Sequence, residues 1–312
     1  MSGSGFDAPP PPPPTPPMPP GGGEGAAAGG MGGDALPPRG LGDILSAAFT
    51  IYKAHALQLI VIVAIIVVPL QFISSLLGDV VFKADTKTVD TLGTSIQVIE
   101  PRSLGIVWLS ILVGAIIAVI ITAMLQAAVL RAAAQATIGD SVDATESYKF
   151  GFRKVGSVIW LSILVGLVTL SIMILGVALA FAVKALGILV ILAGVVFAVW
   201  ASVSLSASIP VLVVEDKRGT EAMKRSWNLV KGDFWHVLGT LIVAGLIVGV
   251  VSGIFTSLGG SNWVLGWIFG SIARIITAPF TALVAVLLYL DLRARKEGLT
   301  ASTLRGELHT DG

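Results

Sequence analysis

Arg274 is the residue whose type and position most directly suggest chemistry, because it is the one charged side chain in the long apolar segment from Trp263 to Leu290. A guanidinium near the centre of a bilayer costs from about 2.5 to more than about 10 kcal/mol, so it must face protein, water or a headgroup. Its planar fork suits the phosphate of a lipid or an anionic solute. Alternatively, Trp263 and Trp267 mark the outer interface and Arg274 extends its charge toward that surface.

No set of residues in this sequence specifies a reaction. The absence of cysteine excludes disulfides, thiolate metal sites, iron–sulfur clusters and a thiol nucleophile. His55, His236 and His309 each lack a partner at the helical spacing that a zinc site requires. Apart from Arg274, the apolar segments carry no Asp, Glu, Lys or Arg for acid–base work. The sequence therefore predicts a protein with no catalytic activity, no metal and no cofactor.

Six apolar segments are long enough to cross a bilayer as helices. A hydrocarbon core of about 30 Å needs roughly 20 residues at about 1.5 Å per residue. With 54% hydrophobic and only 12% charged residues, the chain is far more apolar than a soluble domain, of which roughly a quarter is charged. We therefore predict six transmembrane helices, with a solvated loop between the first two: Ala56–Leu77, Leu104–Leu130, Val158–Ala182, Leu186–Val214, Phe234–Leu258 and Trp263–Leu290.

Basic residues are distributed unevenly between the two sides of these spans. The termini and the connections after the second and fourth spans carry 15 Lys and Arg, whereas the opposite side carries 4. The positive-inside rule then places both termini in the cytoplasm and the chain in the cell membrane. Because the basic residues lie next to spans, anionic lipid explains them better than nucleic acid does.

Three stretches before the first, third and fifth spans combine an apolar stripe with basic residues. They run from Asp43 to Lys53, from Asp143 to Lys154 and from Thr220 to Lys231. This pattern is typical of helices that lie on anionic headgroups, so we expect a cytoplasmic collar of three interfacial helices. Their similarity indicates three tandem units, each an interfacial helix followed by a two-helix hairpin. The candidate headgroup ligands are Arg153, Lys154, Lys224, Arg225 and Lys231.

Glycine and proline residues within the spans predict packing rather than chemistry. Gly245, Gly249 and Gly253 form two Gly-x-x-x-Gly steps, and Gly266 with Gly270 forms another. Small residues four apart let backbones approach closely, so the fifth and sixth spans should pack together or at a dimer interface. Three prolines break helical hydrogen bonding within or at the ends of spans, where neighbouring helices usually repair the loss: Pro69, Pro210 and Pro279.

The first 42 residues hold 12 of the 16 prolines and 12 of the 36 glycines. Such a segment buries too little apolar surface to offset the entropy of ordering, which predicts a disordered tail with polyproline II character. It is either a solvated tail or a docking segment for a protein partner that recognises proline.

Four segments resemble a known family: Gly42–Lys53, Ile209–Glu215, Lys224–Lys231 and Leu288–Gly298, with the last three reading IPVLVVE, KRSWNLVK and LYLDLRARKEG. They are similar to the membrane domain of glycerophosphoryl diester phosphodiesterases and to stand-alone bacterial membrane proteins of that family, common in actinobacteria. The resemblance covers about residues 40 to 298. In the phosphodiesterases a metal-binding catalytic barrel follows, whereas here 22 residues follow Leu290. The resemblance therefore implies the membrane fold without the reaction.

These observations predict an all-α polytopic membrane protein with a disordered tail (1–42), a six-helix domain (43–298) and a short C-terminal tail (299–312). Our first hypothesis for its function is a non-enzymatic scaffold that engages lipid headgroups, a protein partner or a second copy of itself. The alternative is a transporter or lipid-handling protein with a pathway near Arg274 and Pro279.

Overall fold

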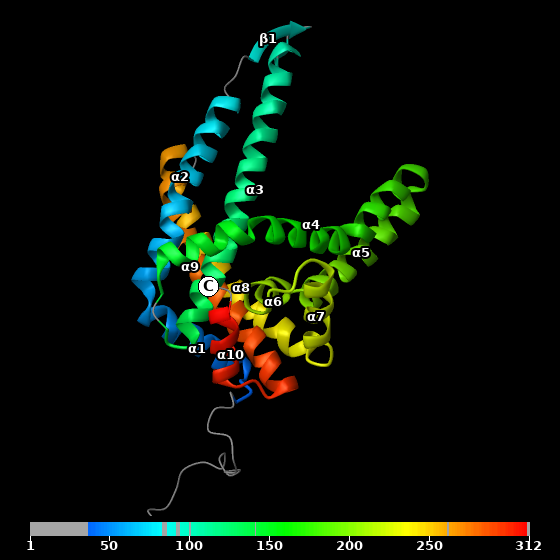
Figure 1. Ribbon diagram of the computed structural model, residues 1–312. Coiled ribbons are helices and arrows are strands. Elements are labelled where there is room, and N and C mark those ends of the chain that lie inside the picture. Colours follow the sequence, from blue (N-terminus) through cyan, green and yellow to red (C-terminus); the bar gives the residue numbers. More distant parts are fainter. Residues whose placement is uncertain are drawn as a thin grey trace, which may run out of the picture. The chain divides into compact units, whose positions relative to one another are not determined.

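The computed structural model describes residues 37–82, 86–91, 94–99, 101–140, 142–260 and 262–310 (Figure 1). Helices account for most of these residues, which confirms the all-α prediction. Most of the predicted disordered tail lies outside the described residues, which begin at residue 37. The helices are α1 (Leu41–Ala54), α2 (Ala56–Phe82), α3 (Pro101–Thr137), α4 (Ala144–Ala182), α5 (Lys184–Ser204), α6 (Ser208–Glu215), α7 (Thr220–Val230), α8 (Phe234–Gly259), α9 (Trp263–Glu297) and α10 (Ala301–Thr310).

Among the described residues, five helices are long and apolar enough to cross a membrane, or six if the bent pair of α1 and α2 counts as one span. This agrees with the six predicted spans and makes the chain a multi-pass membrane protein. The fourth predicted span is interrupted, because α5 ends at Ser204 and α6 begins at Ser208.

Helix α9 is the central helix of the fold. Two thirds of its most apolar stretch is buried, against 6% for that of α4. It packs against α2, α3 and α8, and Leu283, Leu287 and Tyr289 are fully buried in these contacts. The position of α9 explains why polar residues from several elements meet along it.

Three pairs of helices that follow one another in the sequence pack against each other: α2 with α3, α4 with α5, and α8 with α9. Figure 1 shows α2 and α3 side by side, and likewise α4 and α5. That these pairs are repeats of one another stays a prediction. The α4–α5 pair is very close, because a Cβ on Gly187 would lie only 2.3 Å from the Cα of Ala180, and Gly176 and Gly194 also meet backbone atoms.

The three predicted interfacial stretches have different outcomes. The first is α1, which bends by 82° relative to α2, and the third is α7, so both are separate helices. The second continues without a break into the span as α4, which begins where Asp143 accepts hydrogen bonds from the backbone N–H groups of Thr145 and Glu146 (2.7 and 3.2 Å). Gly151 and Gly156 lie in or just after this stretch, but the helix continues through both, so a separate helix was wrong.

Two features outside the spans were not expected. The loop between the first two spans contains an antiparallel hairpin of β1 (Thr86–Thr91) and β2 (Thr94–Ile99), with Thr91 opposite Thr94. The many β-branched residues in this sequence favour strands over an irregular loop. The predicted C-terminal tail also contains α10, which buries Leu304.

Candidate functional site

A cavity of about 400 Å³ opens beside the middle of α9 and brings Arg274 together with residues of α2, α3 and α6. Its polar lining consists of Thr122, Gln126, Ser206, Arg274, Thr277 and Thr281, and its apolar lining includes Val67, Leu125, Val129 and Ile209. A mostly apolar pocket of this size with a few convergent polar groups is typical of small-ligand sites. We refer to it as the Arg274 cavity.

Arg274 lies well inside the candidate span that α9 forms. It follows Trp263 by eleven residues of continuous helix, or about 16 Å, which is close to half of the roughly 30 Å hydrocarbon core. This distance is longer than an arginine side chain, so the guanidinium cannot reach the level of Trp263. The indole of Trp267 donates instead to the carbonyl of Val68 on α2 (3.3 Å).

The guanidinium of Arg274 makes no hydrogen bond or ion pair with the part of the chain that the structure describes, and the residue is exposed. Thr277 and Thr281 lie on the same face of α9, where their hydroxyls donate to the carbonyls of Ala273 and Thr277 (2.7 and 2.9 Å). The hydroxyl oxygens keep lone pairs for water or a ligand. The cavity therefore offers one positive charge and several neutral polar groups.

The break between α5 and α6 adds backbone to the cavity wall. Ser206 and Pro210 both line the cavity, and Pro210 has no N–H with which to reach the carbonyl of Ser206 four residues earlier. The turn is fixed from outside, since Ser226 of α7 donates to the carbonyl of Ser204 (2.9 Å) and accepts from the N–H of Ala207 (3.2 Å). The turn is a local irregularity, because Leu186–Glu215 as a whole still forms one candidate span.

A second polar assembly gathers at the C-terminal end of α9. Glu215, at the end of α6, accepts hydrogen bonds from Lys217 (2.6 Å), Tyr289 (2.8 Å) and Arg225 (3.0 Å). Arg225 also pairs with Glu297 (2.8 Å). Arg293 connects Tyr289, Glu297 and Glu307, at 3.0, 3.2 and 2.6 Å. This ion-pair cluster joins α6, α7, α9 and α10.

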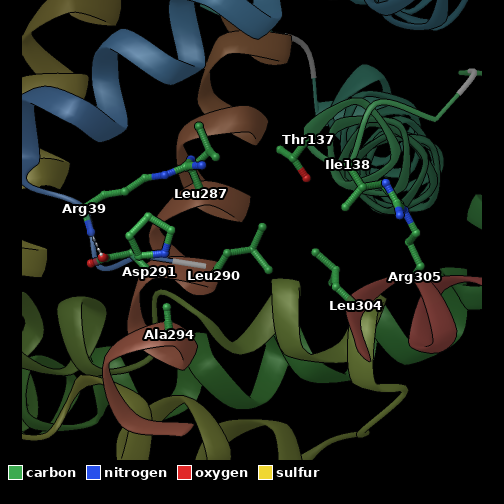
Figure 2. Close-up of a pocket in the computed structure, with 10 residues that line it drawn as sticks. Arg39, Thr137, Ile138, Leu287, Leu290, Asp291, Ala294, Leu304 and Arg305 are labelled. Carbon is green, nitrogen blue, oxygen red and sulfur yellow. Dashed lines mark hydrogen bonds between the residues drawn. The ribbon is translucent and has the colours of Figure 1, made fainter. Parts of the chain in front are cut away.

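Asp291 forms a neighbouring junction in which the start of the described chain meets α9. Its side chain is fully buried and accepts from the backbone N–H of Arg39 (2.6 Å) and from Arg295 (2.8 Å), and lies 3.1 Å from His236 Nε2. Figure 2 shows this contact at the rim of a pocket of about 170 Å³, which Leu287, Leu290 and Leu304 make largely apolar. The pocket is less than half the size of the Arg274 cavity.

The predicted headgroup ligands differ in how deeply they are buried. Arg225 belongs to the ion-pair cluster, and the buried Lys154 binds Asp216 at 2.6 Å. Burial alone would raise the pKa of Asp216, but hydrogen bonds from Lys154 and Arg218 outweigh it and hold the pKa below its usual value. Both cations tie elements together, so a headgroup would have to compete with their carboxylates. The exposed ones are Arg153, Lys224 and Lys231.

Of the glycines that were expected to join the fifth and sixth spans, Gly266 lies at their contact, whereas the three on α8 do not. A Cβ added to Gly245, Gly249 or Gly253 would meet nothing within 4 Å. Helices α8 and α9 instead approach at their connecting turn, where a Cβ on Gly259 would lie 2.9 Å from the Cα of Gly266. Gly270 faces Gln71 of α2, 3.8 Å from where a Cβ would stand. A dimer interface along the three open glycines stays a prediction.

Pro279 is not part of the cavity wall. It is buried in α9 between the lining residues Ala278 and Thr281. The proline that lines the cavity is Pro210, whereas the sequence had suggested Pro279. The cavity residues that sequence reasoning missed have a recognisable spacing. Thr122 and Gln126 lie four residues apart on α3, and Arg274, Thr277 and Thr281 follow the helical repeat on α9.

The residues of the ion-pair cluster are those on which the family resemblance was based. Glu215, Arg225, Tyr289, Arg293 and Glu297 all lie in the segments quoted above, which were interpreted there as recognition motifs and not as partners of one another. Neither the curated proteins nor the solved structures contain a match to the chain. The family comparison does match, over a narrower range than residues 40 to 298. Residues 177–291, which hold α6, α7 and Arg274, match the family model of the membrane domain of glycerophosphoryl diester phosphodiesterase.

Proposed function

We propose that this chain is a lipid-handling membrane protein that binds an anionic amphiphile in the Arg274 cavity. The observation that carries the proposal is a guanidinium within an apolar candidate span that lines a cavity of about 400 Å³ and has no carboxylate partner among the described residues. An arginine in hydrocarbon is stabilised by water or by an anion, and its fork binds phosphate or carboxylate oxygens in pairs.

The rest of the lining suits the other end of such a ligand. Val67, Leu125, Val129 and Ile209 present an apolar wall next to the polar face of α9. A single acyl or isoprenoid chain would replace lipid along this wall, while the acidic group meets Arg274. Thr277, Thr281 and the carbonyl of Ser206 would orient the group by hydrogen bonds. The proposal contains binding and transfer and no chemical step.

The lipid-handling hypothesis gains more from the geometry than the scaffold hypothesis does. A scaffold that uses its collar needs free cations, and Arg225 and Lys154 are engaged with Glu215, Glu297 and Asp216. We also place the protein in the cell membrane with both termini in the cytoplasm, because the distribution of Lys and Arg favours this orientation.

Cysteine accessibility tests whether the cavity admits water and polar solutes, and the absence of native cysteine makes every signal specific. Single cysteines at Arg274 and Ser206 should react with a membrane-impermeant polar thiol reagent in nanodiscs, and an anionic lysolipid should slow the reaction. Leu246, at the middle of α8, is 61% exposed without lining any cavity described here, so a cysteine there should face lipid and stay inert.

A reaction at Arg274 that is no faster than at Leu246 would overturn the proposal. Lipid retention provides the second measurement, by mass spectrometry of the protein purified in a mild detergent. Arg274→Gln should lose an anionic amphiphile that the wild type retains, whereas Arg274→Lys, which keeps the charge, should retain part of it. Equal retention by all three proteins would show that Arg274 does not bind the amphiphile.

A further inference from the structure

A second concave surface lies between α3 and the first turns of α4, away from the Arg274 cavity. It has a volume of about 750 Å³ and is lined by Arg131, Glu146, Lys149, Phe150, Phe152 and Arg153 among others. We refer to it as the α3–α4 groove. The proposed function does not use it.

Positive charge dominates the groove. Arg131, Lys149 and Arg153 contribute three cations, against the single carboxylate of Glu146. Glu146 is 54% exposed and stands 3.9 Å from Arg131, so it neutralises the groove weakly. The lining therefore brings more basic than acidic side chains to one surface, which favours a phosphate-bearing ligand.

The position of one of these cations is fixed by packing. Arg131 is only 3% exposed, and its guanidinium lies 4.8 Å from the centre of the Phe150 ring. The start of α4 is held in turn by Tyr148, whose hydroxyl donates to the carbonyl of Ile62 on α2. A buried cation stacked on an aromatic ring, at the base of an open groove, is a prearranged anion site.

An apolar side chain stands beside the charges. Phe152 lines the groove, is 74% exposed and lies close in sequence to the basic residues Lys149 and Arg153. Arg153 precedes the predicted start of the third span at Val158 by five residues, or about 8 Å of helix. This short distance from the span favours a position of the groove near lipid headgroups, a depth at which aromatic residues such as Phe152 concentrate.

We infer that the α3–α4 groove binds the headgroup of an anionic phospholipid from the surrounding bilayer, with its phosphate at Arg131, Lys149 and Arg153 and its glycerol and upper acyl chain against Phe152. Basic pockets between transmembrane helices bind such headgroups through the same combination of charge and depth. The site would sense the charge of one leaflet independently of the Arg274 cavity.

The test compares lipid retention by the full chain after exchange into detergent with equal parts of phosphatidylcholine and phosphatidylglycerol. All proteins also carry Arg274→Gln, so lipid held in the Arg274 cavity does not contribute. We expect the parent to retain phosphatidylglycerol in preference, and Lys149→Gln with Arg153→Gln to lower its affinity by about thirtyfold. Lys53→Gln with Arg305→Gln removes two exposed charges elsewhere and should leave retention unchanged.

Two further arms separate the possible sources of the phosphate. Phe152→Ser should weaken retention of phosphatidylglycerol, and inorganic phosphate should not displace the lipid, because a free anion gains nothing from the apolar part of the groove. Displacement by inorganic phosphate at a concentration matched to the lipid would overturn the assignment to a phospholipid. Equal retention of both lipids, or an effect of the Lys53 and Arg305 variant as large as that of the groove variant, would overturn the site itself.

Discussion

At the scale of single residues, the decisive difference among the cations of this chain is the presence of a partner. Lys154 and Arg225 sit in hydrogen-bond contact with carboxylates, whereas Arg274 faces a cavity. The amino-acid sequence identifies all three as charges next to or within spans. It does not identify their partners, because Asp216 is 62 residues from Lys154 and Glu297 is 72 residues from Arg225.

The Lys154–Asp216 pair leads to a prediction about pH. Because the pKa of Asp216 is lowered in the fold, the pair stabilises the protein above the ordinary carboxyl pKa, and this stability is lost as the pH falls through the lowered value. Asp216→Asn should therefore cost about 1 kcal/mol at neutral pH and progressively less below about pH 4. Asparagine tolerates the left-handed backbone of Asp216 (φ 50°), so strain does not contribute.

Thermal unfolding of the purified protein in detergent as a function of pH checks this expectation. Lys154→Met serves as the matched variant, and the double variant shows whether the two effects are coupled. A difference between wild type and Asp216→Asn that stays constant down to pH 3 would show that the carboxylate charge contributes nothing.

At the scale of helices, the sequence predicted most of the spans and fewer of their contacts. A run of about 20 apolar residues specifies a membrane helix by length alone, which is why all six segments appear as helices. Their interruptions depend on tertiary partners. The turn between α5 and α6 is stabilised by a hydrogen bond from Ser226 of α7, and the local sequence does not predict that contact.

Glycine motifs show the same limit. The Gly-x-x-x-Gly steps of α8 have open space around them, while the close contacts belong to Gly176, Gly187 and Gly194 of the α4–α5 pair. A small residue permits a close approach but does not select the neighbouring helix. The sequence could predict that Arg274, Thr277 and Thr281 share one polar face of a span. It could not predict that residues of α2, α3 and α6 close the cavity around that face.

This contrast predicts opposite effects of two identical substitutions. Gly187→Ala places a Cβ 2.3 Å from the Cα of Ala180 and should destabilise the protein by about 1–3 kcal/mol through forced separation of α4 and α5. Gly249→Ala fills open space and should be neutral or stabilise α8 by up to about 1 kcal/mol. Thermal unfolding in detergent measures both, and a loss at Gly249 as large as that at Gly187 would reveal an oligomer contact along α8.

At the scale of the whole molecule, the arrangement around α9 follows from its burial on several sides. Helices α2, α3 and α8 contact it along the membrane, and α1, α6 and α7 contact it near its C-terminal half. The order of elements along the chain does not reveal this central role, because α9 is the last predicted span. The long-range hydrogen bonds that Asp291 and Glu215 accept could not be predicted from the pattern of residues along the sequence.

The proposed orientation is tested by two single cysteines. Lys224, exposed on α7, and Asn262, exposed in the turn between α8 and α9, are separated by the whole of α8 and should react with an impermeant thiol reagent from opposite sides of the membrane. With both termini in the cytoplasm, the Lys224 position should react only after the membrane is opened. Labelling of both positions in intact cells would be incompatible with α8 as a span.

The hydrogen bond between Asp291 and the N–H of Arg39 joins residues 252 positions apart in the chain. During synthesis, Arg39 leaves the ribosome before α1, whereas its acceptor on α9 follows only after α8. This hydrogen bond therefore cannot form until α9 has been translated. A chain that stops before Asp291 lacks this junction, and one that stops before Tyr289 also lacks the Tyr289–Glu215 hydrogen bond, so both tests of a complete α9 fail together in such a fragment.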